Sequence, residues 1–344
     1  MLLFIVLADA FTTIVLARRT QRTLRMTRYF YRLTWWAYAT PGRRIRDGES
    51  REDYLSIYGP LSFLVLLGTW AVGAIAAFGL FQWSFGLVLD DAPASLADAL
   101  FFSGTVLFTV GSNPAMNGGG RALMIVEAGL GFSSIALSVA YLPILYQSYS
   151  TRELRIALLD ARAGSPPSAG ELLARLGGNP GEIETQLAKW EEWTAEVMQH
   201  HLSYPMLAYF RSHHSNQSWV SALTAMMDTA AVVMIASRGD LQRQAQLTFA
   251  MGRHALADLA RLFAGDPEPF PPERLPAADF ERLRLRIESS QTPLSPELVT
   301  QGELAKWRKC YEPHAQALSI HFLMALPQWL PGEPPYDNWI MHGA

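Results

Sequence analysis

A stretch of sequence without any charge most constrains this chain. Residues 59–89 contain no Asp, Glu, Lys, Arg or His, and about 20 apolar residues are enough to carry a helix across roughly 30 Å of hydrocarbon. Residues 60–83 therefore predict a membrane-spanning helix. Residues 122–146 predict a second one, in which Glu127 is the only charged side chain.

The first residues of the chain predict a further span, although the apolar run is short. Residues 1–17 carry one charge, Asp9, and a carboxylate is costly in a membrane unless it is neutral, paired or turned toward protein. A cleaved signal peptide has its positive charges before the apolar run, whereas here the arginines begin at Arg18. We therefore predict an uncleaved span with its N-terminus outside.

Positive charge is concentrated on one side of the predicted spans. Residues 18–54 hold ten Arg and four acidic residues, whereas residues 55–150 hold a single basic residue, Arg121. Because basic loops remain in the cytoplasm, residues 18–54 and 151–344 are expected inside and the loop before the last span outside. We expect a multi-pass protein of a prokaryotic cell membrane.

The basic segment also predicts a lipid partner. Arg19, Arg22, Arg25 and Arg28 recur at every third position, as in a voltage-sensor helix. Polar residues separate them, however, and a voltage sensor needs more than the single span that precedes this segment. We therefore interpret the Arg-rich segment as a basic amphipathic helix on anionic membrane lipid.

A short helix and a polar loop separate the two long spans. Ser95, with Asp98 three residues on, is typical of a capping box, and residues 99–107 continue as an apolar helix. Glycine, asparagine and proline then break the helix over residues 111–120. Irregular backbone at membrane depth is tolerated where it lines a cavity or is covered by protein. This order of elements is that of a cation-channel pore.

The sequence of this region carries a resemblance to a known family. Residues 95–114 read SLADALFFSGTVLFTVGSNP, and residues 120–144 read GRALMIVEAGLGFSSIALSVAYLPI. Together they resemble the pore module of the potassium-channel superfamily, over roughly residues 60–150. The resemblance implies a pore helix, a filter loop and an inner helix, with monovalent cations, potassium first among them, as the transported ions. One loop cannot surround an ion alone, so it also implies a homotetramer.

The filter motif of that family identifies the expected ion site. Thr109, Val110 and Gly111 match its first three positions, whose backbone carbonyls replace the water shell of the ion. Ser112 and Asn113 stand where Tyr and a second Gly are usual. Asn tolerates left-handed backbone, but the small Ser removes packing behind the filter. The resemblance therefore implies a cation filter of reduced potassium selectivity.

Four residues of the predicted inner helix are candidates for gating or support. Gly129 and Gly131 lie where the family often bends, although small residues equally serve close helix packing. Pro143 predicts a kink near the cytoplasmic end of the helix. Glu127 either braces the filter through a hydrogen bond or lies at the wet interface, and we favour bracing.

The remainder of the chain predicts a helical cytoplasmic domain. Proline-rich residues 265–277 predict a linker, and proline-rich residues 327–339 predict a tail. Asp228 lies in an apolar helix and is interpreted as a hydrogen-bonded structural carboxylate. Apolar residues recur at helical spacing over residues 154–159, 187–197, 220–235 and 249–263.

No motif predicts a catalytic residue, a cofactor or a bound metal. Cys310 is the only cysteine, which excludes an internal disulfide and argues against a cysteine-based zinc site. The neighbouring pairs His200–His201 and His213–His214 lack the HExxH spacing of metal sites. The net charge of −3 gives no sign of a nucleic-acid partner.

Taken together, the patterns predict an all-α membrane protein in four parts. These are an N-terminal span over residues 1–17, a basic juxtamembrane segment over 18–58, a channel-like pore module over 59–150 and a helical cytoplasmic domain over 151–344. The expected function is a cation pore of reduced selectivity. The alternative is a non-conducting, channel-derived membrane scaffold or sensor whose cytoplasmic domain binds a partner. A membrane-tethered enzyme is disfavoured by the missing motifs.

Overall fold

Helices dominate the structure of the chain. The computed structural model describes residues 1–14, 26–89, 92–111, 117–176, 178–268, 271–290 and 292–331. The only strands among them are the short antiparallel pair β1 (Val88–Leu89) and β2 (Ala92–Pro93), so the predicted all-α class is confirmed. The chain forms two units, which we name the membrane unit (Met1–Pro41 with Ile57–Ser148) and the C-terminal unit (Gly42–Ser56 with Tyr149–Ala344).

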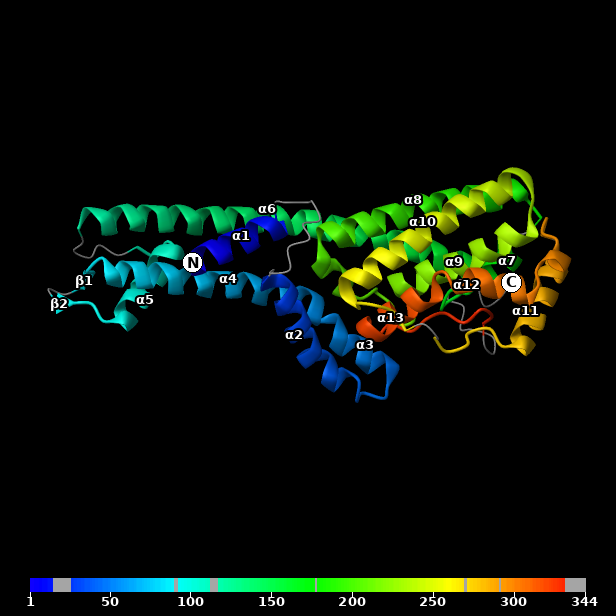
Figure 1. Cartoon of the computed structure of the whole chain (residues 1–344), viewed down its shortest axis with the longest axis horizontal. Helices are drawn as coiled ribbons and strands as arrows, with labels where there is room; N and C mark the ends of the chain where they lie inside the picture. Colours follow the sequence, from blue (N-terminus) through cyan, green and yellow to red (C-terminus); the bar gives the residue numbers. More distant parts are fainter. Residues whose placement is uncertain are drawn as a thin grey trace, which may run out of the picture. The chain divides into compact units, whose positions relative to one another are not determined.

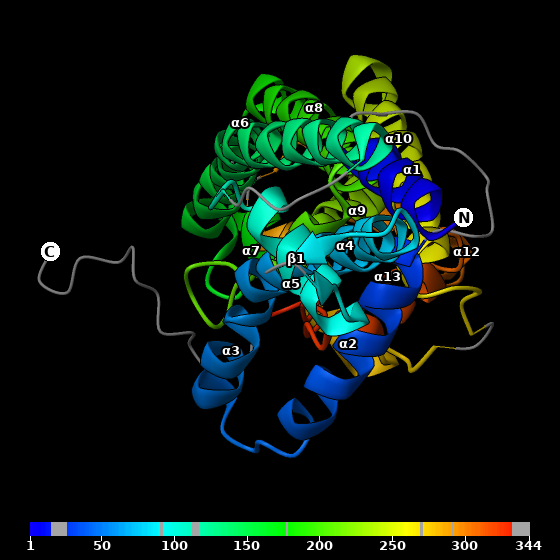
Figure 2. The same ribbon diagram turned by 90° about the vertical axis from the view of Figure 1, so that its left-hand side faces the viewer.

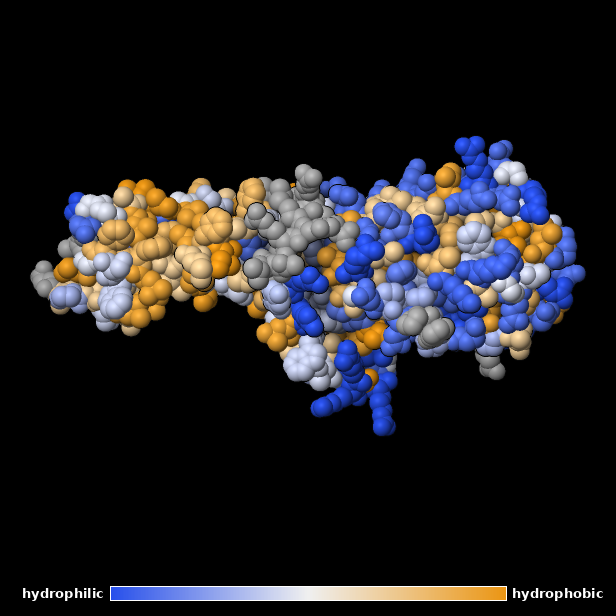
Figure 3. Space-filling model, in the orientation of Figure 1, coloured by the Kyte–Doolittle hydropathy of each residue, from blue (hydrophilic) through white to orange (hydrophobic). Residues whose placement is uncertain are grey.

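Two long apolar helices characterise the membrane unit. The 27 residues of α4 extend for about 40 Å, and α6 is longer still. Both are long and apolar enough to cross a membrane, and hydrophobic side chains dominate the visible surface of this unit (Figure 3). The prediction of two long apolar helices over residues 60–83 and 122–146 is therefore confirmed. The unit contains α1 (Leu2–Ile14), most of α2 (Met26–Gly42), α4 (Tyr58–Ser84), α5 (Leu96–Leu107) and the first part of α6 (Gly118–Ala163) (Figure 1).

Helix α1 is shorter than the span predicted over residues 1–17. Its 13 residues extend for about 20 Å, which is less than the roughly 30 Å of hydrocarbon, and residues 15–17 lie outside the described residues. Asp9 of α1 is buried and turned toward protein. It accepts hydrogen bonds from the amide and hydroxyl of Thr27, at 3.2 and 2.6 Å, and from the Trp70 indole at 3.0 Å. These donors offset the cost of a carboxylate among apolar helices.

The C-terminal unit is a bundle of helices around α9. Helix α9 is long and apolar enough to span a membrane, but 94% of its apolar window is buried inside protein. Helices α7, α8, α10, α12 and α13 pack against it (Figures 1 and 2), so its apolar surface forms the core of this unit. The unit contains α3 (Gly48–Ser56), the last part of α6, α7 (Ala169–Leu176), α8 (Pro180–Ser203), η1 (Pro205–Tyr209), α9 (Trp219–Ala236), α10 (Gly239–Phe263), α11 (Ala277–Ser289), η2 (Pro296–Leu298), α12 (Gln301–Arg308) and α13 (Glu312–Phe322).

The basic segment predicted over residues 18–58 is divided between the two units. Helix α3 groups with the C-terminal unit, because Glu52 forms an ion pair of 3.2 Å with the buried Arg211. Arg211 also donates to the carbonyl oxygens of Phe322 and Leu323 at the end of α13. A contact between residues this far apart in the chain has no local sequence signal.

Candidate functional site

Helix α5 begins at the capping box that the sequence predicts. The Ser95 hydroxyl accepts a hydrogen bond from the Asp98 amide at 3.2 Å, and the Asp98 carboxylate accepts one from the Ser95 amide at 3.0 Å. Two backbone donors at the start of the helix are thereby satisfied. The helix follows over Leu96–Leu107, which confirms the predicted short helix.

The contacts of α5 with α4 define the direction in which it runs. Leu100 of α5 contacts Gly79 of α4. One turn further along α5, the Ser103 hydroxyl donates to the carbonyl oxygen of Ile75 at 3.1 Å. As α5 advances, its contacts on α4 therefore move backward, away from the end of α4 at Ser84. The two helices lie antiparallel.

Helix α6 covers the other side of α5 and runs parallel to it. Ser103 is hydrogen-bonded to Glu127, and Leu107 contacts Gly131. Gly131 follows the first residue of α6 by 13 positions, which is about 20 Å along the helix. The end of α5 therefore lies beside the middle of the apolar part of α6. Ala99, Phe102 and Val106 of α5 pack with Leu87, Met124 and Ala128 to hold it there.

The glycines of α6 differ in their surroundings. A Cβ atom at Gly131 would lie 2.0 Å from the carbonyl oxygen of Leu107, whereas a Cβ at Gly129 would meet no atom within 4 Å. Gly131 is thus required by the close approach of α5, and Gly129 has open space beside it. Pro143 lies within α6, which continues as one helix past it.

Helix α5 ends in a turn that brings Thr109 into left-handed backbone. The amide of Thr109 donates to the Val106 carbonyl at 3.0 Å, and that of Val110 donates to the Thr105 carbonyl at 2.8 Å. This pair of bonds is a Schellman motif, with Thr109 at φ 56°. Left-handed backbone costs a β-branched residue about 1–2 kcal/mol relative to glycine. Threonine at this position is therefore less favourable than glycine would be.

The three filter candidates that the structure describes are exposed. Val110 is 74% exposed, and Thr109 and Gly111 are also exposed. Among the described residues, no group donates a hydrogen bond to the carbonyl oxygens of Thr109, Val110 or Gly111. The other two filter candidates, Ser112 and Asn113, lie outside the described residues.

Glu127 belongs to a buried polar cluster formed by three helices. Its carboxyl is fully buried and accepts a hydrogen bond from Ser103 of α5. Gln82 of α4 is also buried and close enough to interact with this carboxyl, although its amide does not have the geometry of a hydrogen bond. Sequence reasoning singled out Glu127 and missed Ser103 and Gln82. Their one signal was that each is a polar residue in an otherwise apolar helix.

One face of α6 carries a stripe of small residues. Ala122, Gly129, Ser133, Ala136 and Ala140 are exposed and are spaced by 7, 4, 3 and 4 residues, which places them on one side of a helix. The side chains of Glu127, Tyr141 and Leu145 occupy the opposite, buried side. Large apolar side chains flank the stripe on both sides and are exposed: Ile125, Phe132 and Val139 on one, Val126, Leu137 and Ile144 on the other.

A buried ion network holds the C-terminal unit together. The guanidinium of Arg274 donates to both oxygens of Asp228, at 3.1 and 2.7 Å, and to Glu312 at 2.8 Å. Tyr311 also donates to Asp228, and Arg308 donates to Glu312 at 3.0 Å. Asp228 is fully buried, so its predicted structural role as a hydrogen-bonded carboxylate is confirmed.

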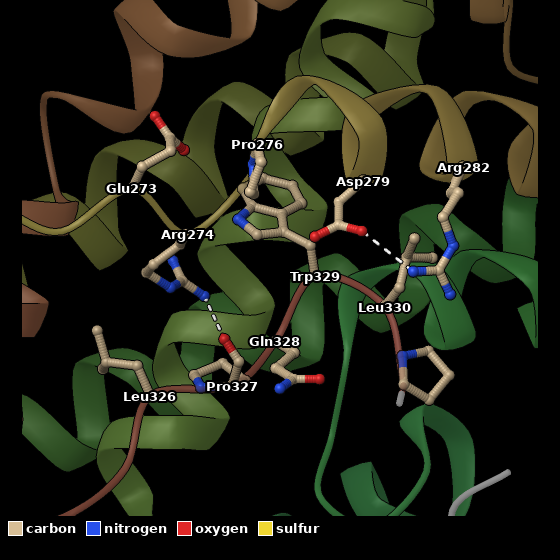
Figure 4. Close-up of a pocket in the computed structure, with 11 residues that line it drawn as sticks. Glu273, Arg274, Pro276, Asp279, Arg282, Leu326, Pro327, Gln328, Trp329 and Leu330 are labelled. Atoms are coloured by element: carbon tan, nitrogen blue, oxygen red, sulfur yellow. Dashed lines mark hydrogen bonds and ion pairs between the residues drawn. The ribbon is translucent and has the colours of Figure 1, made fainter. Parts of the chain in front are cut away.

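A pocket of about 370 Å³ lies beside this network (Figure 4). Pro276, Pro327, Trp329 and Leu330 line it, so the segments predicted as a proline-rich linker and tail meet here. Sequence reasoning missed the pocket because it treated these segments separately. Each charged residue of the lining already has an oppositely charged partner: Glu273 with Arg308, Arg274 with Asp228, and Asp279 with Arg282.

The histidines of the described residues do not assemble into a metal site. His201 is buried against the ring of Trp219, with ring centres 4.7 Å apart. Burial, and then the neighbouring Arg152 guanidinium, lower the pKa of His201 to about 3, so it is a neutral core residue at physiological pH. Within the described part of the chain, no group of three or more His, Cys, Asp or Glu side chains is arranged to hold a metal ion.

Comparisons with known proteins support the membrane assignment. The chain is 25% identical over 185 residues to the uncharacterized membrane protein YdjJ of Bacillus subtilis (strain 168), a match that covers 52% of this chain and 54% of that protein. The chain thus spans about half the length of that relative. No family model matches the sequence, and no solved structure matches it significantly.

Proposed function

We propose that four copies of this chain form a cation pore with Thr109, Val110 and Gly111 at its filter. The observation that carries the proposal is the exposed loop after α5. Its carbonyl oxygens accept no hydrogen bond from the described residues, and α5 ends about 20 Å along α6. Irregular backbone at this depth requires protein or a water-filled cavity around it. The described residues of one chain supply neither around this loop, so further copies complete the site.

The chemistry of the loop favours a cation as the transported ion. Rings of backbone carbonyls replace the water shell of a dehydrated cation, and the C-terminal end of α5 directs partial negative charge toward the same place. Thr109, Val110 and Gly111 have no charged side chains of their own. Potassium is the first candidate, through the resemblance of the Thr-Val-Gly run to a potassium filter.

The small-residue stripe of α6 supports the same arrangement. In a ring of four chains, a face of Ala, Gly and Ser suits a water-filled cavity below the filter, while the large flanking side chains suit lipid and neighbouring chains. The proposed orientation follows the distribution of arginine. Residues 18–54 and 151–344 are expected in the cytoplasm of a cell-membrane protein, and residues 90–121 outside.

Cation flux in proteoliposomes tests the proposal. The purified protein should have the mass of a tetramer in lipid and should pass potassium with little discrimination against sodium. Restoring the usual filter residues by Ser112→Tyr with Asn113→Gly should raise the potassium preference about tenfold, or ~1.4 kcal/mol, as read from the reversal potential in mixed salts.

The same experiment separates the alternatives. Strong potassium selectivity in the natural protein would refute the argument about Ser112 and Asn113. A monomer or dimer would refute the pore itself. An intact tetramer that passes no ions in either form would favour the scaffold or sensor whose cytoplasmic domain binds a partner.

Cysteine accessibility tests the role of the stripe. In a Cys310→Ser background, Ser133→Cys should react with a water-soluble cationic thiol reagent and lose most of its flux, because Ser133 is proposed to face the cavity. Val139→Cys, on a flanking row of α6, is the matched control and should keep its flux. Equal inhibition of both variants would contradict the assignment of the cavity face.

A further inference from the structure

Helix α2 has two faces of different character. Thr27, Tyr31, Trp35 and Ala39 point into the membrane unit and are buried. The opposite face exposes large apolar side chains, since Tyr29 is 55%, Leu33 66% and Trp36 65% exposed. Arg28 and Arg32 precede Trp36 at four-residue spacing, so these three residues form one row that borders this face, and both arginines are exposed.

Contacts with α4 place α2 at the edge of the membrane. Thr34 of α2 lies 2.9 Å from the hydroxyl of Tyr58, which is the first residue of α4. The rings of Trp35 and Tyr38 also contact Tyr58, with ring centres 4.8 and 5.2 Å apart. Because α4 is a spanning helix, α2 lies beside the end of a span, where hydrocarbon gives way to headgroups.

The charged residues of α2 and of the four residues that follow it are all positive. Between Met26 and Arg46 there are five arginines and no acidic residue. Neither Arg28 nor Arg32 forms an ion pair with another residue that the structure describes. The outward side of α2 therefore combines an aromatic and apolar strip with two bordering arginines that have no acidic partner among the described residues.

We infer that this face of α2 binds anionic phospholipid of the bilayer surface. Arg28 and Arg32 contact the phosphate groups, while Tyr29, Leu33 and Trp36 enter the boundary between headgroups and acyl chains. A helix facing only water would not expose three large apolar side chains in one strip, and a helix inside hydrocarbon would not carry two arginines there. Interfacial helices combine these features, and the anionic lipid of the cytoplasmic leaflet supplies the opposite charge. This inference is independent of ion conduction.

Lipid titration tests the inference on the full-length protein. Phosphatidylglycerol is titrated into protein held in phosphatidylcholine and detergent, and bound lipid is counted by native mass spectrometry. The double substitution Arg28→Gln with Arg32→Gln is expected to weaken phosphatidylglycerol binding roughly 30-fold. Each arginine near an anionic surface strengthens binding by about fivefold, and the two contributions multiply. Arg28→Lys with Arg32→Lys, which keeps both charges, should retain most of the affinity.

A charge-matched control completes the test. Arg282→Gln with Arg284→Gln removes the same charge from exposed positions of α11 and should leave lipid binding unchanged. Unaltered lipid binding in the Arg28→Gln and Arg32→Gln variant would overturn the inference. The outward face of α2 would then be assigned to a protein partner instead. A loss of equal size in the control would also overturn it, because it would show an effect of net charge alone.

Discussion

Replacing Gly131 by alanine is expected to displace α5 and to abolish ion flux. The new methyl group would lie 2.0 Å from the carbonyl oxygen of Leu107, and this obstacle is backbone, which cannot move aside as the end of a side chain can. Overpacking of this kind costs about 3 kcal/mol at the upper end of its usual range. The measurement is a thermal melt of the purified protein in detergent, followed by flux in proteoliposomes.

Gly129→Ala is the matched control for this prediction. A Cβ at Gly129 meets nothing within 4 Å, so the melting temperature should remain close to that of the natural protein. The pair also separates two roles for glycine in α6. If Gly131 acted only as a gating hinge, its substitution would change gating and leave the melting temperature unaltered. Equal melting temperatures for all three proteins would contradict the close packing of α5 on α6.

Replacing Asp228 by alanine is expected to destabilise the C-terminal unit severely. Burial disfavours the charge of Arg274, yet its carboxylate neighbours, Asp228 foremost, raise the pKa of Arg274 above its ordinary value. Removing Asp228, which is fully buried, leaves this guanidinium without its bidentate partner. Breaking a buried pair from one side costs about 3–5 kcal/mol, a large fraction of the stability of an ordinary domain. Urea unfolding followed by circular dichroism measures the loss.

Two further variants test whether the loss of the buried ion network causes the expected destabilisation. Asp279→Ala breaks the exposed pair with Arg282, whose side chains are 40% and 63% exposed, and surface pairs contribute at most about 1 kcal/mol. Asp228→Leu combined with Arg274→Met removes both charges of this buried pair and should recover much of the stability. A loss for Asp228→Ala no larger than that for Asp279→Ala would contradict the account.

Local chemistry in the sequence determined much of this fold. The uncharged residues 59–89 predict a span because a charge in hydrocarbon is costly whatever surrounds it. Ser95 and Asp98 predict the start of α5 because both hydrogen bonds of a capping box close within one turn. The apolar periodicity predicted the helices of the C-terminal unit for the same reason: helical spacing is a property of a few consecutive residues.

Tertiary structure alone decided which distant residues meet. Nothing near Gly131 in the sequence distinguishes it from Gly129, and only the position of Leu107 makes one of them indispensable. Asp9 looked like a costly charge in a short span until Thr27 and Trp70 supplied its donors. Likewise, Asp228 accepts a hydrogen bond from Arg274, which lies 46 residues further along the chain. These contacts depend on how helices pack, and packing is determined by shape and burial across the whole unit rather than by any local pattern.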